Sequence, residues 1–369
     1  MAGPTSAPGQ SEDVALVVDG QEWRGWTEVT VERYIDALAG AFRLQLTTRW
    51  PGISEPRPIA PGLDAQITIG GEAVITGRLR DVQPAYDRQS NGVAVTGADL
   101  TQRLVDFSAM PNQYSGLGLS ELIGRIVAPF GITVIASASL GEPVARFVVE
   151  DGETAFDAIE RACRLRGVLP LTNAAGQLVL ARAGETAATA AVRGGWGGNV
   201  EAARGQFTDR DRASEYIVKA QRPRRDTDDD ESSAAHIVGT ALDETVVGYA
   251  PLIIIANDPL DQAEALARAQ WERSIRRGRA RRVTVTLSGW RDADGKLWQV
   301  NTRVPYRDDI LGIDAELLVA GVQLQRSDQG TTAILELADP AAFTPDPTGE
   351  IEIGWGGDVP PKPVARPAW

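Results

Sequence analysis

The sequence predicts an α+β protein that is mostly β, with a β module towards each end of the chain, an α/β insert between them and flexible termini. Three observations predict this class. Between residues 14 and 98, short alternating apolar and polar runs are separated by turn signals, as in a small barrel or sandwich. Near residue 115 the apolar spacing becomes that of helices. After residue 215 the strand pattern returns.

The first β module is expected at residues 14–112, after a flexible arm at residues 1–13. Phe42, Leu44 and Leu46 alternate with polar residues, so one face of this strand should be buried. Glycine pairs and Ser-Asn-Gly mark turns between the strands. Further strands are expected at residues 66–69, 73–80 and 93–97.

The α/β insert is expected at residues 113–183, with two helices. The first has Ser120 as its N-cap, ends at Gly131 and carries one apolar stripe: Leu119, Leu122, Ile123, Ile126, Val127 and Phe130. The second begins at Thr154 and ends at Gly167. It should point inwards the side chains of Phe156, Ile159 and Cys163. Strands are expected at residues 132–136, 146–150, 168–171 and 177–181.

The second β module is expected at residues 184–345, with a connector and one long helix. Asp258 should cap this helix and Pro259 should start it, and the helix should end near Arg277. One apolar stripe is expected at Leu260, Ala267, Trp271 and Ile275. Strands are expected at residues 216–221, 283–290, 298–304, 317–324 and 332–337.

Two glycine-rich segments resemble each other without forming a repeat, at residues 195–200 and 354–359. Each is interpreted as a turn with an anchoring tryptophan, Trp196 in the first. Residues 346–369 are rich in Pro and Gly and are expected to be a tail without a core.

Composition excludes several classes of protein. The net charge of −13 argues against nucleic-acid binding, which needs an excess of Lys and Arg. The single cysteine excludes internal disulfides and cysteine-rich zinc clusters. The sequence has no apolar run long enough for a membrane helix and none at its N-terminus, so we expect folding in the cytoplasm without membrane insertion.

No residue pattern indicates catalysis. His236 is the only histidine and has no Cys or second His nearby, and Cys163 occupies an apolar helical position. The acidic run at residues 226–231 has enough oxygens for a cation but lacks the calcium-loop spacing, so a solvated loop or a partner contact is the default interpretation. The glycine-rich segments match neither phosphate loops nor nucleophile elbows. We therefore expect no enzyme, cofactor or metal.

One segment suggests a different function. Val149–Ile159 is similar to the start of a LysM peptidoglycan-binding motif, although any capped helix after a strand gives such a string. A tail-associated peptidoglycan-binding or cell-wall-degrading protein is thus the alternative to a structural role.

A series of segments resembles one family in order and spacing across residues 14–343. They are residues 97–109 (GADLTQRLVDFSA), 153–169, 176–182, 214–221, 249–255, 268–272, 278–280 and 288–301 (SGWRDADGKLWQVN). The chain resembles the baseplate hub proteins of Mu-like bacteriophages and prophages. Phe107 departs from the family, where many relatives have Cys, and we expect it to be a buried apolar residue.

The resemblance implies two small tail-tube-like β-barrel modules and a homotrimeric ring. Three chains would present six barrels and so join a six-fold tail tube to a three-fold central spike. The implied partners are the tail tube protein, the spike protein and other baseplate proteins, and the implied location is the virion tail. The implied role is structural.

A basic cluster ends the long helix, in a chain that is acidic overall: Arg276, Arg277, Arg279, Arg281 and Arg282. Arginines at a helix C-terminus can simply favour the helix dipole. They can also bridge to an acidic neighbouring chain, because interfaces favour Arg. Arg276, Arg277 and Arg279 are therefore candidate intersubunit contacts.

Overall fold

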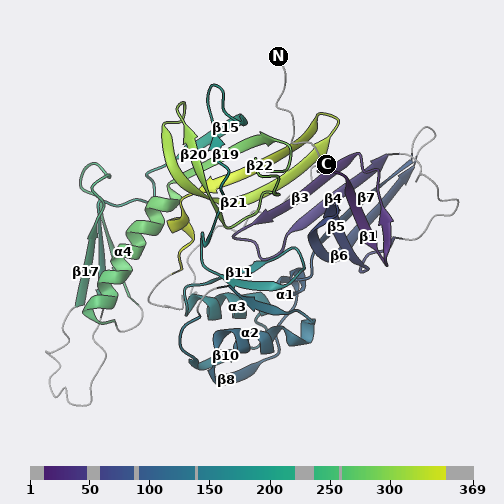
Figure 1. Ribbon diagram of the computed structural model, residues 1–369. Helices are drawn as coiled ribbons and strands as arrows, with labels where there is room; N and C mark the ends of the chain where they lie inside the picture. The colour runs from purple at the N-terminus through teal and green to yellow at the C-terminus, as the bar shows by residue number, and fades with distance from the viewer. Residues whose placement is uncertain are drawn as a thin grey trace.

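The computed structural model describes residues 12–47, 59–86, 91–137, 140–220, 237–256 and 260–345. One long sheet crosses the molecule, and Figure 1 shows a small α/β unit beneath it and a helix with short strands at one end. The described part of the chain is mostly β, as the sequence predicts.

The N-terminal strands follow the predicted alternation closely. They are β1 (Val14–Val18), β2 (Gln21–Trp23), β3 (Glu28–Tyr34), β4 (Ala41–Thr47), β5 (Asp64–Ile69), β6 (Glu72–Tyr86) and β7 (Asn91–Asp99). Phe42 and Leu44 are buried, and Gly70 and Gly71 form the predicted turn with positive φ angles of 60° and 84°. A positive φ is easily adopted by glycine, which explains the sharp reversal between β5 and β6.

The C-terminal strands range in length from two to fifteen residues. They are β13 (Thr186–Ala187), β14 (Val192–Arg193), β15 (Val200–Phe207), β19 (Arg281–Ser288), β20 (Thr302–Asp308), β21 (Ile313–Ser327) and β22 (Gly330–Ala338), followed by the 3-10 helix η3 (Pro340–Phe343). The strand expected at residues 298–304 begins only at Thr302, because Trp290 and Trp298 close a turn in front of it.

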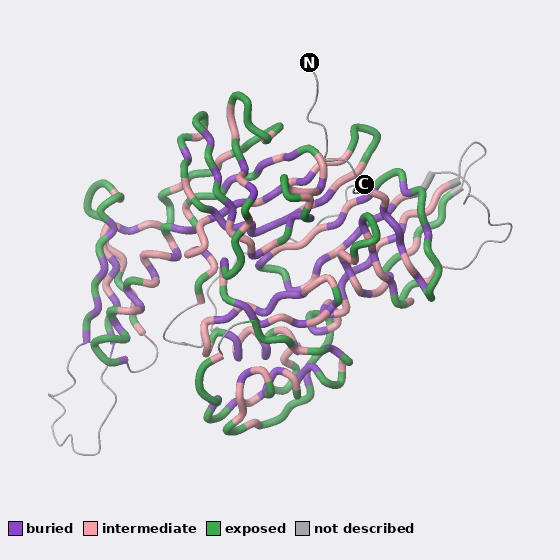
Figure 2. Tube along the Cα trace, viewed as in Figure 1, coloured by how far each residue is buried: buried purple, intermediate pink, exposed green. Residues whose placement is uncertain are grey.

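Both sets of strands belong to a single 14-stranded sheet, in which β3 pairs with β21 in antiparallel register from Gly321↔Tyr34 to Arg326↔Val29. Two separate closed barrels are not seen in the described residues, where the strands continue from one module into the next. One apolar core also includes residues of both modules, and Figure 2 shows buried segments, in purple, in the strands of both. The modules are therefore fused edge to edge.

The α/β unit contains α1 (Gln102–Asp106), β8 (Asn112–Leu117), α2 (Leu119–Val127), the 3-10 helix η1 (Ala128–Phe130), β9 (Val134–Ala136), β10 (Val144–Val149), α3 (Ala155–Arg164), β11 (Leu169–Thr172) and β12 (Leu178–Ala181). Thr154 caps α3 by accepting the Asp157 N–H, as predicted. For α2 the predicted cap is wrong: Gly118 is the N-cap and Ser120 lies inside the first turn. The predicted stripe of α2 is buried except for Phe130, which is partly buried.

At the far end of the molecule a second unit contains β16 (Glu215–Ala220), β17 (Ile237–Leu242), β18 (Pro251–Ile255) and α4 (Gln262–Arg279). The strands form a 3-stranded sheet of their own, in the order β17-β16-β18, and α4 covers one face. Asp261 caps α4 in a capping box with Glu264, so the helix starts later than predicted. Asp258 and Pro259 lie outside the described residues.

The buried face of α4 differs from the predicted stripe. It contains Ala265, Ala269 and Ile275 but also Arg268 and Glu272, which form an ion pair of 3.2 Å. Trp271 and Ala267 are only partly buried. An apolar stripe could not reveal this face, because two of its buried members are charged and paired to each other.

Two exposed aromatic side chains contradict the sequence expectations. Trp196 is fully exposed (101%), so it does not anchor its turn. Phe107 is 54% exposed and therefore is not the buried apolar residue that was expected. Phe107 is the C-cap of α1 and has an extended backbone, and its side chain lies outside the core.

Candidate functional site

The sequence offers no catalytic candidate, and of the two residues weighed for chemistry the structure describes Cys163 but not His236. Cys163 is buried in the core of the α/β unit, and burial raises the pKa of its thiol, which keeps it protonated. Across the described ranges, no three His, Cys, Asp or Glu side chains come together as metal ligands, and no helix is long and apolar enough to cross a membrane. His236 and the acidic run 226–231 lie outside the described residues.

The arginines at the end of α4 have different surroundings. Arg276 donates to Glu272 at 2.9 Å and to the Asp211 carbonyl at 3.3 Å, so it is paired within its own chain. Burial lowers the pKa of Arg279, and the neighbouring positive charges add to this effect. Arg277 is exposed and pairs with no carboxylate of the described residues. Arg279 is exposed as well and pairs with no carboxylate of the described residues, so Arg277 and Arg279 are the two of these three that remain available for a neighbouring chain.

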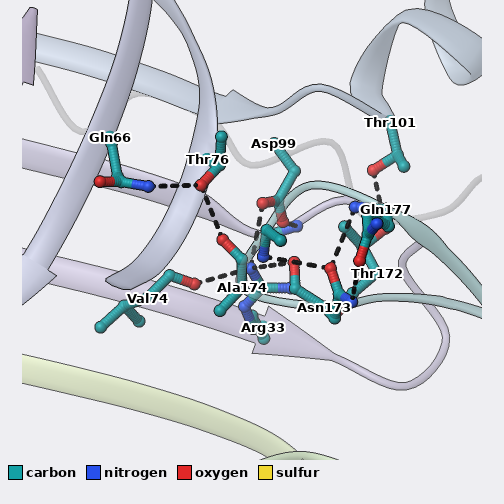
Figure 3. Close-up of polar contacts among 12 residues, drawn as sticks. Arg33, Gln66, Val74, Thr76, Asp99, Thr101, Thr172, Asn173, Ala174 and Gln177 are labelled. Carbon is teal, nitrogen blue, oxygen red and sulfur yellow. Dashed lines mark hydrogen bonds and ion pairs between the residues drawn. The ribbon is translucent and has the colours of Figure 1, made fainter. Parts of the chain in front are cut away.

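A buried polar junction, which sequence analysis missed, joins the long sheet to the α/β unit (Figure 3). Arg33 on β3 donates to the Asp99 carboxylate at 3.0 Å, to the Val74 carbonyl at 2.9 Å and to the Thr172 carbonyl at 2.7 Å. One guanidinium thus connects β3 with β6, β7 and β11. Because Arg presents several donors in a rigid plane, it can fix these elements together.

Asp99 is the buried counter-charge of this junction, with a side chain that is 0% exposed. Its second oxygen accepts the Gly40 N–H at 2.7 Å. Burial raises the pKa of Asp99 to about 6, although Arg33 and the Gly40 N–H act in the opposite direction. A Cβ at position 40 would lie 2.9 Å from the Asp99 carboxylate, so only glycine allows this close approach.

Hydroxyl groups extend the junction on both sides (Figure 3). Thr172 donates to the Leu38 carbonyl at 2.6 Å, and its hydroxyl lies 2.7 Å from that of Thr101. Thr76 donates to the Ala174 carbonyl at 2.8 Å. The hairpin between β11 and β12 is therefore held against the sheet by polar contacts from several strands, which is a positioning arrangement and not a catalytic one.

A cavity of about 560 Å³ lies beside this junction. Its walls come from β3, β6, the β11–β12 hairpin and the segment 297–302, and they are mainly apolar. Arg33 and Glu32 line it, and so do Ser137 and Glu185, where the Ser137 hydroxyl donates to the Glu185 carboxylate at 3.1 Å. The cavity marks the place where three parts of the fold meet.

Several strands have an unpaired edge in the described part of the chain, and two such segments belong to the long sheet, on β15 and β6. β15 pairs only with β19, and the second half of β6, from Asp81 to Tyr86, pairs only with β7. The side chains of residues 201–204 on β15 are all exposed. Such edges carry free backbone donors and acceptors, so they are able to pair with another chain.

The fold described above is that of bacteriophage tail proteins. A 43 kDa tail protein of prophage MuSo2 from Shewanella oneidensis matches with a TM-score of 0.79 and 33% identity, over 90% of this chain and 99% of that chain. An Escherichia coli component of the type VI secretion system, described as similar to the T4 tail proteins gp27 and gp5, matches with a TM-score of 0.54 at 10% identity, over 87% of this chain and 76% of that chain. The latter likeness concerns the fold alone.

The sequence comparison identifies the family. Baseplate hub protein gp44 of Escherichia phage Mu is 34% identical over 358 residues, which cover 94% of this chain and 93% of gp44. Residues 13–99 match the N-terminal domain of Mu phage baseplate assembly protein GpP-like, residues 101–182 the second domain of gp44-like hub proteins, and residues 261–346 the fourth domain of GpP. The chain belongs to the Mu-type baseplate hub protein family, and its homologues are structural proteins.

Proposed function

We propose that this baseplate hub protein forms a homotrimeric ring that joins a six-fold tail tube to a three-fold central spike. The observation that carries the proposal is the edge-to-edge pairing of the two β modules through β3 and β21. Three chains would supply six such modules, which matches a six-fold partner on one side and a three-fold partner on the other. The tail tube protein, the spike protein and other baseplate proteins are the proposed partners.

The free strand edges support ring closure. If β15 of one chain pairs with Asp81–Tyr86 on β6 of the next, the sheet continues around the ring. The unpaired backbone groups of both strands would then be satisfied. Assembly in the host cytoplasm and the domain limits 14–112, 113–183 and 184–345 belong to the same proposal, while the family-model matches at residues 13–99 and 101–182 meet near residue 100, before the proposed limit at 112.

Light scattering of the purified protein tests the ring directly. The expected mass is three times the 39.4 kDa of one chain. A protein that stays monomeric at every concentration and in assembled tails would refute the proposal.

Two adjacent substitutions test the β15 edge. Successive N–H groups of a strand point to opposite edges, so Ala202→Pro and Ala203→Pro remove one donor towards β19 and one towards the free edge. One variant should keep the thermal stability of the monomer and lose the trimer, while the other should lose stability. Two variants that both keep the trimer mass would exclude this edge from the interface.

The alternative function depends on the segment Val149–Ile159. In the structure, Thr154 caps α3, and Val149, Ala155 and Ile159 are buried in the core, so these residues serve the fold. A zymogram with peptidoglycan checks the alternative.

A further inference from the structure

The small sheet at the end of the molecule has one face that α4 covers and one face that no described residue covers. Val218, Ala241, Ala265 and Ala269 are buried between this sheet and α4. The other face exposes large apolar side chains, with Ile255 on β18 77% exposed and Leu242 on β17 57% exposed. A single-layer sheet with two apolar faces is unusual for a soluble chain that acts alone.

The strand register gives this outer face two largely apolar outer strands, β17 and β18, on either side of a mixed central strand, β16. Ile217 on β16 lies beside Ile253 on β18, and Lys219 lies between Val238 and Ile255. Tyr249, which is almost fully exposed, precedes β18. The outer face of β17, β16 and β18 is called the apolar sheet face below. Its apolar members are Ile217, Val238, Leu242, Ile253 and Ile255, and the polar residues Glu215, Lys219 and Thr240 share the face.

A basic hollow lies at the Leu242 end of the apolar sheet face. This hollow of about 460 Å³ is lined by three arginines, Arg212, Arg277 and Arg281, and by two aspartates, Asp209 and Asp339, together with Phe207 at the end of β15. Arg212 donates to Asp243 at 2.7 Å, but its Nε is buried and has no hydrogen-bond partner among the described residues. Unsatisfied arginine donors beside an apolar surface favour an occupant that brings acidic groups.

The loop between β16 and β17 has an unsuitable composition for covering this face. Residues 221–236 read QRPRRDTDDDESSAAH and contain no large aliphatic or aromatic residue. A second copy of the chain, by contrast, offers both apolar surface and acidic charge, because the chain has 50 Asp and Glu against 37 Lys and Arg. Composition therefore favours a second copy of the chain over the intervening loop.

Position favours the same occupant. The unit of β17 and α4 lies at one end of the molecule, opposite the N-terminal strands β1, β6 and β7, as Figure 1 shows. A closed ring of identical chains uses a head-to-tail contact between two different surfaces, which an elongated chain presents at its two ends. Phe207 also connects the hollow to β15, whose free edge is part of the proposed ring contact.

We propose that the apolar sheet face and the adjoining arginine hollow bind the neighbouring copy of this chain, an inference that rests on the ring proposed above. The neighbour contributes acidic side chains to Arg277 and Arg281 and an apolar surface to Ile253 and Ile255. The contact lies beside the strand pairing and adds side-chain specificity to it.

A double substitution tests the apolar part. Ile253→Lys with Ile255→Lys places charge on exposed positions, so the monomer should keep its melting temperature. The dissociation constant of the trimer should rise at least about 30-fold, as for loss of central interface anchors. Met110→Lys, at a position 75% exposed on the α/β unit, is the matched control and should leave the trimer unchanged.

A labelling experiment tests the same contact without charge. Because Cys163 is buried, a maleimide will react with the Ile255→Cys variant at the introduced thiol and not at the native one. The introduced thiol should react slowly in the trimer and rapidly after dilution to monomer, whereas that of Met110→Cys should react equally in both states.

The outcomes separate the two proposals. A wild-type protein that never forms trimers overturns both. A stable trimer in which the double variant still assembles and the thiol of Ile255→Cys reacts freely overturns only the surface assignment. Protection of that thiol that appears only in assembled baseplates shows a different protein on this face and overturns the second copy as its occupant.

Discussion

Removal of Arg33 should destabilise the junction between the long sheet and the α/β unit. Arg33→Ala leaves the Asp99 carboxylate, which is 0% exposed, without its counter-charge, and leaves the carbonyls of Val74 and Thr172 without this donor. Loss of one partner from a buried ion pair costs about 3–5 kcal/mol. After this change the carboxylate keeps the backbone hydrogen bonds from Gly40 and Thr76, which do not replace the lost positive charge.

Urea denaturation at pH 8 measures this cost, with Asp99→Asn as the second arm of a double-mutant cycle. In the Asp99→Asn background this buried charge is absent, so Arg33→Ala should cost about 2 kcal/mol less than in the wild type. At pH 5 the single variant should approach the wild type, because a protonated Asp99 needs no counter-charge. Equal costs in both backgrounds, or a cost below about 1 kcal/mol, would refute the assignment of a buried ion pair.

Three further predictions concern stability and assembly. The pKa of Asp99 is raised from 3.8 to about 6, so the stability that its protonation contributes is complete below pH 3.8 and is lost as pH rises through 6. Urea titrations at several pH values should show this loss for the wild type but not for Asp99→Asn. Trp271→Ala should lower monomer stability by about 2 kcal/mol, since a half-buried ring and its 2.7 Å hydrogen bond to the Thr344 carbonyl are removed. In thermal melts, Trp271→Phe should recover most of the lost stability. Arg276→Glu should lower the melting temperature, because it breaks the ion pair with Glu272. Arg277→Glu should leave the melting temperature unchanged and weaken the trimer most at low salt, as measured by light scattering. The reverse pattern would contradict the assignment of Arg277 to the contact between chains.

Elements with local signals could be predicted from the sequence. The helix α3 is predicted from a cap at Thr154 and from inward positions such as Ile159 and Cys163, all within ten residues. The strand β4 is predicted from strict alternation. In these segments the burial pattern and the local hydrogen bonds favour the same conformation, so the sequence is informative.

The junction and the fused sheet could not be predicted in the same way. Arg33 and Asp99 are 66 positions apart, and each alone is typical of a solvated strand residue. The pairing of β3 with β21 depends on which strand edges meet, and no periodicity contains that information. On α4, the buried pair of Arg268 and Glu272 gives a polar signal at positions that the fold encloses.

The fused sheet also constrains how the chain folds during synthesis. β3 is complete early, but its partner β21 emerges from the ribosome about 300 residues later. At typical elongation rates of about 5–20 residues per second, β3 waits roughly 15–60 s with an open edge. Pairing over such a separation is slow, because a long loop must close before any contact forms. The nascent chain is therefore most prone to aggregation through β3, and chaperones that bind exposed strand edges should raise the yield of folded hub protein more than they raise its final stability.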